Sequence, residues 1–207
     1  MAGPPKLKDC KSILVVEGCS DLLFYAELLE HLGKHGSVFI QHLNGKEDLL
    51  LKLEDFITPV LLAEKVKIGV IVDADDNPAG SFVSVQNKLA QLTGQTIPAV
   101  GTWTGGMPDI GLFVTPDGVT HGEIETLVWR AWSANPANSV AQSCIEQYRN
   151  CMATAGLTAH SPDKGLISSL LAIRSDDDPR LGPGARVGIF NFDDPEFADL
   201  RAFLASF

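Results

Sequence analysis

The sequence lacks several features that would place a protein in a familiar class. None of its apolar stretches approaches the roughly 18 residues that a membrane helix needs. The first twelve residues contain lysine but no apolar segment, so we expect neither a membrane span nor a secretory signal. None of the four cysteines forms a C-x-x-C pair, which argues against a zinc ribbon or a thioredoxin-like site. Buried free thiols in a reducing cytoplasm are the expected alternative.

Common catalytic signatures are missing as well. The sequence has no G-x-S-x-G elbow, no H-E-x-x-H pair and no complete P-loop. Serine hydrolases of the elbow type, zinc proteases and P-loop nucleotide sites are therefore disfavoured.

Positive charge is scarce. The chain has 16 Lys and Arg against 26 Asp and Glu, a net charge of −10. A broad basic surface for nucleic acid is not expected, although divalent ions can bridge acidic residues to phosphates. Hydrophobic residues make up 45% and charged residues 20% of the 207 positions, which suits one folded domain or one core with appendages.

Strand-sized apolar runs alternate with helix-length segments through the first half of the chain. This alternation predicts an α/β fold, with a mainly parallel sheet flanked by helices. The later pattern is helical, so we expect an α/β part over 12–120 and a helical C-terminal part over 121–207, separate or packed on the same core. The expected strands are 12–17, 38–43, 67–72, 99–104, 110–115 and 186–192, the fourth and fifth forming an edge hairpin. The expected helices are 21–32, 46–57, 80–92, 125–132, 139–155, 163–174 and 195–207.

Acidic side chains follow two of the expected strands. Glu17 ends the first, and Asp73 ends the third, where Asp75 and Asp76 follow it. Ligands of open parallel sheets bind beyond the carboxyl ends of the strands, and extended alternation would turn Asp73 and Asp75 to the same side. Carboxylates so close together repel one another, and their oxygens suit Mg²⁺ or Mn²⁺. Taken singly, each acid is equally a turn or cap residue, as Asp21 is at a helix start.

These residues resemble the TOPRIM domain of bacterial primases, topoisomerases, ribosomal-RNA maturases and overcoming-lysogenization-defect nucleases. That family has a Glu at the end of its first strand, often within V-E-G-x-x-D, and residues 16–21 read V-E-G-C-S-D. It also has a D-x-D after a later strand, and residues 73–75 read D-A-D. The resemblance covers residues 12–125 and implies a TOPRIM-like, Rossmann-like sheet. Gly80 comes later after the D-x-D than is usual in the family.

A narrower resemblance extends over most of the chain. Thr115-Pro116-Asp117, Gly122-Glu123-Ile124-Glu125 and the closing stretch 190–195 are similar to small stand-alone TOPRIM-related proteins of unknown function, the DUF3226-like group. On this resemblance the helical part is a cap on the sheet and not an independent enzyme.

The resemblance implies a role for each acid. Glu17 would be a metal ligand or general acid/base, and Asp73 and Asp75 would hold Mg²⁺ or Mn²⁺. Glu125, preferred over Glu123, would serve a second metal ion. The accessory residues would be Gly18, Asp21, Asp76 and Glu123. Neither Tyr25 nor Tyr148 has a supporting motif, so a covalent topoisomerase mechanism is not expected.

Two lysines are weaker candidates. Lys46 follows Asn44-Gly45 at an expected helix start, where a phosphate could bind, or it is simply a solvated turn residue. The overcoming-lysogenization-defect nucleases use a lysine near their metals, and Lys164, at an expected helix start, is a candidate for that role by resemblance; otherwise it is a surface lysine.

The sequence therefore predicts a Mg²⁺-dependent phosphoryl-transfer enzyme, a nuclease or a hydrolase of nucleotide phosphodiesters, with Glu17, Asp73 and Asp75 as catalytic residues. Its partners would be nucleotide or nucleic-acid phosphates held through metal, with no membrane. The alternative is a non-catalytic metal- or nucleotide-binding module that serves a protein partner. The sequence leaves the oligomeric state open.

Overall fold

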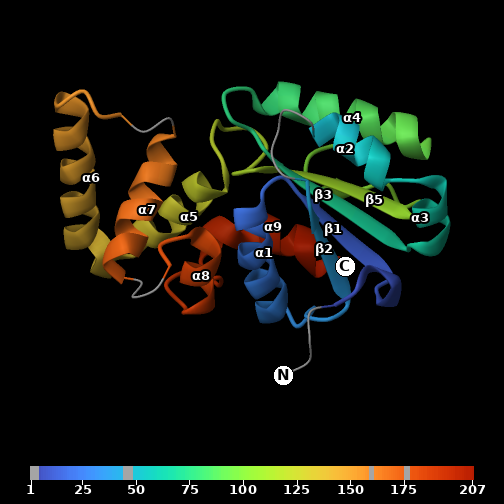
Figure 1. The fold of residues 1–207 in the computed structure, drawn as a ribbon, viewed down its shortest axis with the longest axis horizontal. Helices are drawn as coiled ribbons and strands as arrows, with labels where there is room; N and C mark the ends of the chain where they lie inside the picture. Colours follow the sequence, from blue (N-terminus) through green and yellow to red (C-terminus); the bar gives the residue numbers. More distant parts are fainter. Residues whose placement is uncertain (1–4, 44–48, 159–160, 175–177) are drawn as a thin grey trace.

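The computed structural model describes residues 5–43, 49–158, 161–174 and 178–207, which form one five-stranded sheet with helices on both faces (Figure 1). The strand order is β2-β1-β3-β5-β4. Strands β1 (Ser12–Val16), β2 (Val38–His42), β3 (Lys67–Asp73) and β5 (Asp109–Thr115) are parallel, and β4 (Thr102–Trp103) is antiparallel to β5. The expected α/β class with a mainly parallel sheet is confirmed.

Alternate residues of the central strands face opposite sides of the sheet, and both sides are buried. On one side, Ile13, Ile68 and Ile110 belong to a hydrophobic cluster with residues of three helices. These helices are α2 (Leu49–Phe56), α3 (Pro59–Glu64) and α4 (Pro78–Thr93). On the other side, Leu14 and Phe113 belong to a second cluster with α1 (Cys19–His31). Burial on both faces explains why the strands read as unbroken apolar runs.

The C-terminal helices complete the second cluster. They are α5 (Ile124–Ala134), α6 (Ser139–Thr154), α7 (Pro162–Arg174), α8 (Leu181–Arg186) and α9 (Ala198–Ala205), with short 3₁₀ turns at Leu7–Asp9, Pro136–Asn138 and Pro195–Phe197. Helix α9 lies behind α1 and the strands, whereas α6 stands at the far end and packs on α7 (Figure 1). The division at residue 120 stays a prediction, and the hydrophobic contacts run across it.

Three local predictions are wrong. Helix α1 begins at Cys19, two residues before the expected start of the helix 21–32. The expected strand 99–104 is only two residues long, and no strand forms over 186–192. The apolar alternation there instead serves packing, because Phe190 and Phe192 meet Phe24 with ring centroids 6.5 and 5.5 Å apart.

The cysteines differ from expectation in their exposure. All four are free thiols, but only Cys10 is buried, while Cys19, Cys144 and Cys151 are exposed. In the ranges that the structure describes, no helix is both long and apolar enough to cross a membrane.

Two glycines make room for aromatic rings on the sheet. A Cβ atom on Gly111 of β5 would lie 2.7 Å from ring atoms of Trp103 and 2.8 Å from Phe203. One on Gly69 of β3 would lie 2.6 Å from Phe207. The rings of Trp103 and Phe203 are stacked with centroids 4.8 Å apart. We call this arrangement the glycine trough, and it allows Phe203 of α9 and Phe207 to pack directly on the sheet.

We expect Gly111→Ala to lower the free energy of unfolding by about 1–3 kcal/mol, because buried rings would have to move to admit the methyl group. Urea unfolding measures the loss. A double-mutant cycle with Trp103→Ala is the control, since removing that ring should cancel most of the cost. An equal cost in both backgrounds would show that the trough is not the cause.

Candidate functional site

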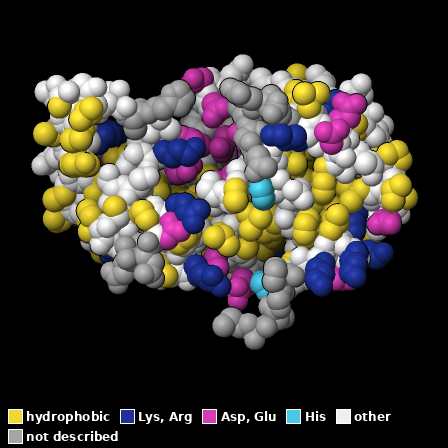
Figure 2. Space-filling model, in the orientation of Figure 1, with side chains coloured by type: hydrophobic (Ala, Val, Ile, Leu, Met, Phe, Trp, Pro, Cys, Tyr) yellow, Lys and Arg dark blue, Asp and Glu magenta, His cyan; other side chains and the backbone are white. Residues whose placement is uncertain are grey.

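The first two acids meet where β1 and β3 end. These strands are direct neighbours, with Val16 in register with Ile71, so the expected adjacency of their carboxyl ends is confirmed. Glu17 follows β1, and its Oε2 lies 3.4 Å from the backbone N–H of Asp73, which donates to it. Figure 2 shows acidic side chains gathered in a hollow between the helical end of the molecule and the sheet.

The Asp73 carboxyl group joins three elements. Its Oδ1 accepts a hydrogen bond from the Thr115 hydroxyl of β5 at 2.5 Å and from the Ile124 N–H at the start of α5 at 3.1 Å. Burial raises the pKa of Asp73 well above its usual value, against the Thr115 hydrogen bond, and the charges of Glu17, Asp21 and Glu125 raise it further. This carboxyl group therefore ties β3, β5 and α5 together at the site.

Asp21 shapes the start of α1 and also lies near Asp73. Its Oδ2 accepts from the Gly18 N–H at 2.9 Å, and its Oδ1 accepts from the Ser20 hydroxyl at 3.0 Å. A Cβ on Gly18 would lie 2.8 Å from that Oδ2, so a larger residue at position 18 would displace the Asp21 carboxylate from this hydrogen bond. The spacing V-E-G-x-x-D thus builds a helix start directly after Glu17, and Asp21 has the capping role that the sequence offered as an alternative.

Glu125 reaches the same place from α5. Its side chain is only 7% exposed, and its Oε2 is buried without a hydrogen-bond partner, while its Oε1 lies 4.0 Å from Lys164 Nζ. Burial raises its pKa to about 7, against the lowering effect of Lys164, and the charges of Glu123 and Asp21 also raise it. A buried carboxylate oxygen without a partner is costly, so this atom is the strongest sign of an interaction still to be made.

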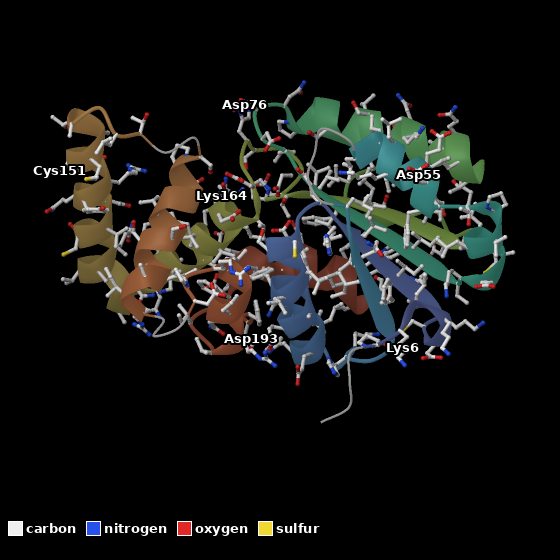
Figure 3. All side chains as sticks on the ribbon, viewed as in Figure 1. Lys6, Asp55, Asp76, Cys151, Lys164 and Asp193 are labelled. Carbon is white, nitrogen blue, oxygen red and sulfur yellow. The ribbon has the colours of Figure 1, made fainter. Side chains whose placement is uncertain are left out.

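Lys164 projects from the start of α7 toward α5 (Figure 3). Its Nζ donates to Oε2 of Glu123, and the Ser161 hydroxyl donates to Oε1 of the same side chain. Burial would lower the pKa of Lys164, but the Glu123 hydrogen bond and the charges of Glu125, Glu123 and Asp73 raise it above its usual value. Lys164 therefore stays charged beside the acids, and Glu123 is engaged with it.

The remaining predicted residues are placed differently. Asp75 has φ +46°, and its N–H and C=O pair with the backbone of Gly122 at 2.9 and 2.8 Å. The extended alternation that would align it with Asp73 therefore ends at Ala74, whose side chain is buried. Asp76 is exposed on the loop before α4 (Figure 3). Lys46 lies outside the described residues.

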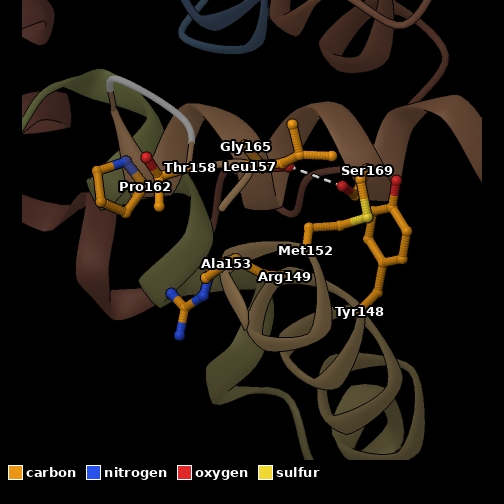
Figure 4. Close-up of a pocket in the computed structure, with 9 residues that line it drawn as sticks. All are labelled: Tyr148, Arg149, Met152, Ala153, Leu157, Thr158, Pro162, Gly165 and Ser169. Atoms are coloured by element: carbon orange, nitrogen blue, oxygen red, sulfur yellow. Dashed lines mark hydrogen bonds between the residues drawn. The ribbon is translucent and has the colours of Figure 1, made fainter. Parts of the chain in front are cut away.

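A cavity of about 330 Å³ opens beside the acids. Glu17 and Asp73 line one side of it, and the first turns of α4 line the other with Gly80, Ser81 and Ser84. A second cavity, of about 360 Å³, lies between α6 and α7 (Figure 4). None of the described residues that line the second cavity is acidic. The first cavity gives a ligand access to Glu17 and Asp73.

As the side chains stand, no three His, Cys, Asp or Glu residues within the described ranges are grouped closely enough to hold a metal ion. The four acids influence one another, as the pKa of Asp73 shows, without forming a finished ligand set.

A family model described as a protein of unknown function (DUF3226) matches residues 11–207. The chain belongs to the DUF3226 family. No curated protein and no solved structure matches it. The DUF3226 resemblance is thereby confirmed, and the match spans both the sheet and the C-terminal helices. The TOPRIM relation of this DUF3226 protein stays a prediction.

Sequence reasoning missed two residues that lie at this candidate site. Tyr25 is buried, which raises its pKa well above its usual value, and the charges of Asp21, Asp73, Glu125 and Glu17 raise it further. Its position four residues after Asp21, one turn along the same helix, was an available signal. Thr115 was the other, since it ends the strand that pairs with β3 in register with Asp73.

The Glu125 carboxyl group makes a testable contribution to stability. Its folded pKa of about 7 lies above the value of 4.5 for a free side chain, so the folded protein holds the proton more tightly. Its contribution therefore decreases as pH rises from 4.5 to about 7 and is constant above that range. We expect Glu125→Gln to stabilise the protein by up to about 3 kcal/mol at pH 8 and by little near pH 4.

Urea unfolding across this pH range measures the difference. Glu64→Gln, at an exposed position on α3, is the matched control and should leave the curve unchanged. If wild type and Glu125→Gln show parallel pH dependence, Glu125 does not take up a proton on folding.

Proposed function

We propose that this DUF3226 protein is a Mg²⁺-dependent phosphoryl-transfer enzyme, a nuclease or a hydrolase of nucleotide phosphodiesters. The observation that carries the proposal is the buried, unpartnered Oε2 of Glu125 beside two further carboxyl groups, Asp73 and Asp21. Glu17 brings a fourth carboxyl group from the end of β1. Asp21, Asp73 and Glu125 lie on α1, β3 and α5, and Glu17 follows β1. Their negative charges repel one another, and a bound cation would reduce that repulsion.

The donors fit a hard divalent cation in their chemistry. Glu17, Asp73 and Glu125 would hold Mg²⁺ or Mn²⁺ through carboxylate oxygens, and the TOPRIM resemblance adds Asp75 to that set. Binding would require the side chains to draw together, since they are not grouped as a ligand set without it. When bound, such an ion polarises a phosphoryl oxygen and lowers the pKa of a coordinated water molecule.

The chain's own groups would orient the substrate. The cavity joins Glu17 and Asp73 to the first two turns of α4, where the Ser84 hydroxyl could donate a hydrogen bond to a phosphate. Lys164 keeps a positive charge next to Glu123 and Glu125, and so it would help to fix their positions and offset negative charge on a phosphate. The net charge of −10 favours a small nucleotide, or nucleic acid delivered by a partner.

The alternative, a non-catalytic binding module, also has support. Both oxygens of Asp21 and one oxygen of Asp73 already serve helix and strand ends. On this alternative the acids would be retained for the architecture of the site and for metal or nucleotide binding, and the protein would act through a partner.

Metal binding is tested by melting with and without millimolar Mn²⁺ or Mg²⁺. We expect the ion to raise the wild-type melting temperature, because a ligand that binds only the folded state stabilises it. Asp73→Asn keeps the Oδ1 acceptor for Thr115 and Ile124 and loses the charge, so its rise should vanish. Asp76→Asn, an exposed acid on the next loop, is the matched control and should keep the full rise.

Catalysis is tested on a panel of nucleotide and nucleic-acid phosphodiesters with the same ion. Loss of the Asp73 charge should lower the rate by at least about 10- to 100-fold, the cost seen for groups that only orient a metal ligand. Metal binding without turnover on any substrate would favour the binding module. No metal effect on melting of the wild type, and no metal-dependent turnover, would contradict both the proposed enzyme and a metal-binding module.

A further inference from the structure

The two edges of the sheet are protected very differently. Edge strand β4 has only two residues, and its Trp103 is covered by Phe203 and by the Lys67 ammonium group, 4.1 Å above the ring. The opposite edge strand, β2, has five residues with the sequence V-F-I-Q-H, without proline, lysine or an acidic residue. Long, uncharged, apolar edges are the ones that pair with other strands.

The backbone of β2 has groups directed away from the sheet. The Leu43 N–H donates to the Val16 carbonyl at 3.1 Å, so by alternation Phe39 and Gln41 bond to β1, and Ile40 and His42 face outward. The outward carbonyl of His42 accepts from its neighbour's side chain, Gln41 Nε2, at 2.7 Å. Within the described ranges β2 pairs only with β1. The Gln41 side chain donates to the His42 carbonyl at the position where the N–H of a neighbouring strand would donate.

An apolar groove runs along the same edge. It has a volume of about 570 Å³ and lies between α1 and β2. Its apolar lining includes Leu22, Ala26 and Leu29 of the helix and Ile40 of the strand. Its charged lining residues are Glu27, Glu30 and Arg186, and Arg186 Nε lies 3.6 Å from Glu27 Oε1. Figure 2 shows hydrophobic side chains gathered between these two elements on the face toward the viewer. A partner strand on β2 would cover the groove and satisfy the outward backbone groups together.

We propose that the occupant is β2 of a second copy of this chain. The two strands pair in antiparallel fashion about a two-fold axis at Ile40, which joins the two sheets into one. In this register Ile40 faces Ile40, Val38 faces His42 and Phe39 faces Gln41, so no two acidic or two basic groups are opposed. The inference does not depend on the proposed function.

Self-pairing fits the surroundings of the strand as well as the strand itself. A two-fold axis perpendicular to the sheet places both α1 helices on the same side and side by side. Because the two helices are then antiparallel, the apolar stripe that contains Leu22 and Ala26 on one helix faces the same stripe on the other, and the small Ala26 permits a close approach. A foreign extended peptide could pair with β2, but it would bring no helix to cover this apolar stripe.

Sedimentation velocity over a range of concentrations tests the oligomeric state. We expect the wild type to sediment at twice the 22.2 kDa mass of the chain. Ile40→Pro removes one outward N–H at a place where an edge strand tolerates proline. Ala26→Glu puts a charge in the groove. Each should weaken the dimer by about 10- to 100-fold.

Val83→Glu is the matched control, since Val83 is 48% exposed on α4, across the sheet from the groove. It should sediment as the wild type does. The melting temperature of each variant shows whether a monomer is still folded. If Ile40→Pro does not fold, Ala26→Glu still tests the dimer, because it leaves β2 unchanged.

Crosslinking tests the register. In a background where Cys19, Cys144 and Cys151 are replaced by serine, Ile40→Cys should form a disulfide between copies under mild oxidation, because opposed Cα atoms in such a pair lie about 5.5 Å apart. Phe39→Cys, which faces Gln41 of the other copy, should crosslink far less. A monomeric wild type, a dimer that persists in both Ile40→Pro and Ala26→Glu, or equal crosslinking at 39 and 40 would each overturn the proposal.

Discussion

Burial of both faces of a parallel sheet is the constraint on which this molecule depends. Strands β1, β3 and β5 direct apolar side chains to both sides of the sheet, and a layer of helices has to cover each side. Helices from the first half of the chain cover one face. The other face needs α1 together with helices from beyond residue 123, so the second half of the chain has to return across the sheet. That return brings the start of α5 to the end of β3, and with it Glu125 to Asp73.

The layered fold was accessible from sequence because double burial leaves a strong pattern. Runs such as that of β3, bounded by helix-length segments, predicted the class and four of the five strands closely. The failures have a common physical origin. Phe190 and Phe192 alternate as strand residues do, but their burial is against Phe24 and not within a hydrogen-bonded ladder. Local alternation reports which side chains are buried, and it does not report what they are buried against.

The site was accessible in part for the same reason. Glu17 and Asp73 could be placed together because neighbouring parallel strands end at the same edge of the sheet. The pairing of Glu123 with Lys164 depends on how α7 packs on α5, and Asp75 turns away from extended geometry through a backbone pair with Gly122. These are long-range contacts with no periodic signal in the sequence. Tyr25 was dismissed for want of a motif, although its spacing from Asp21 placed it on the same helical face.

The glycine trough has a consequence for the order in which the protein can be completed on the ribosome. Two of the rings that fill it belong to Phe203 and Phe207, while Gly69, Trp103 and Gly111 are synthesised far earlier. Domains begin to fold from the N-terminus as they emerge. The sheet can therefore assemble while the glycine trough on one of its faces is still uncovered. A nascent chain at that stage exposes an apolar surface on this face of the sheet, and the surface is covered only when α9 and Phe207 have left the exit tunnel.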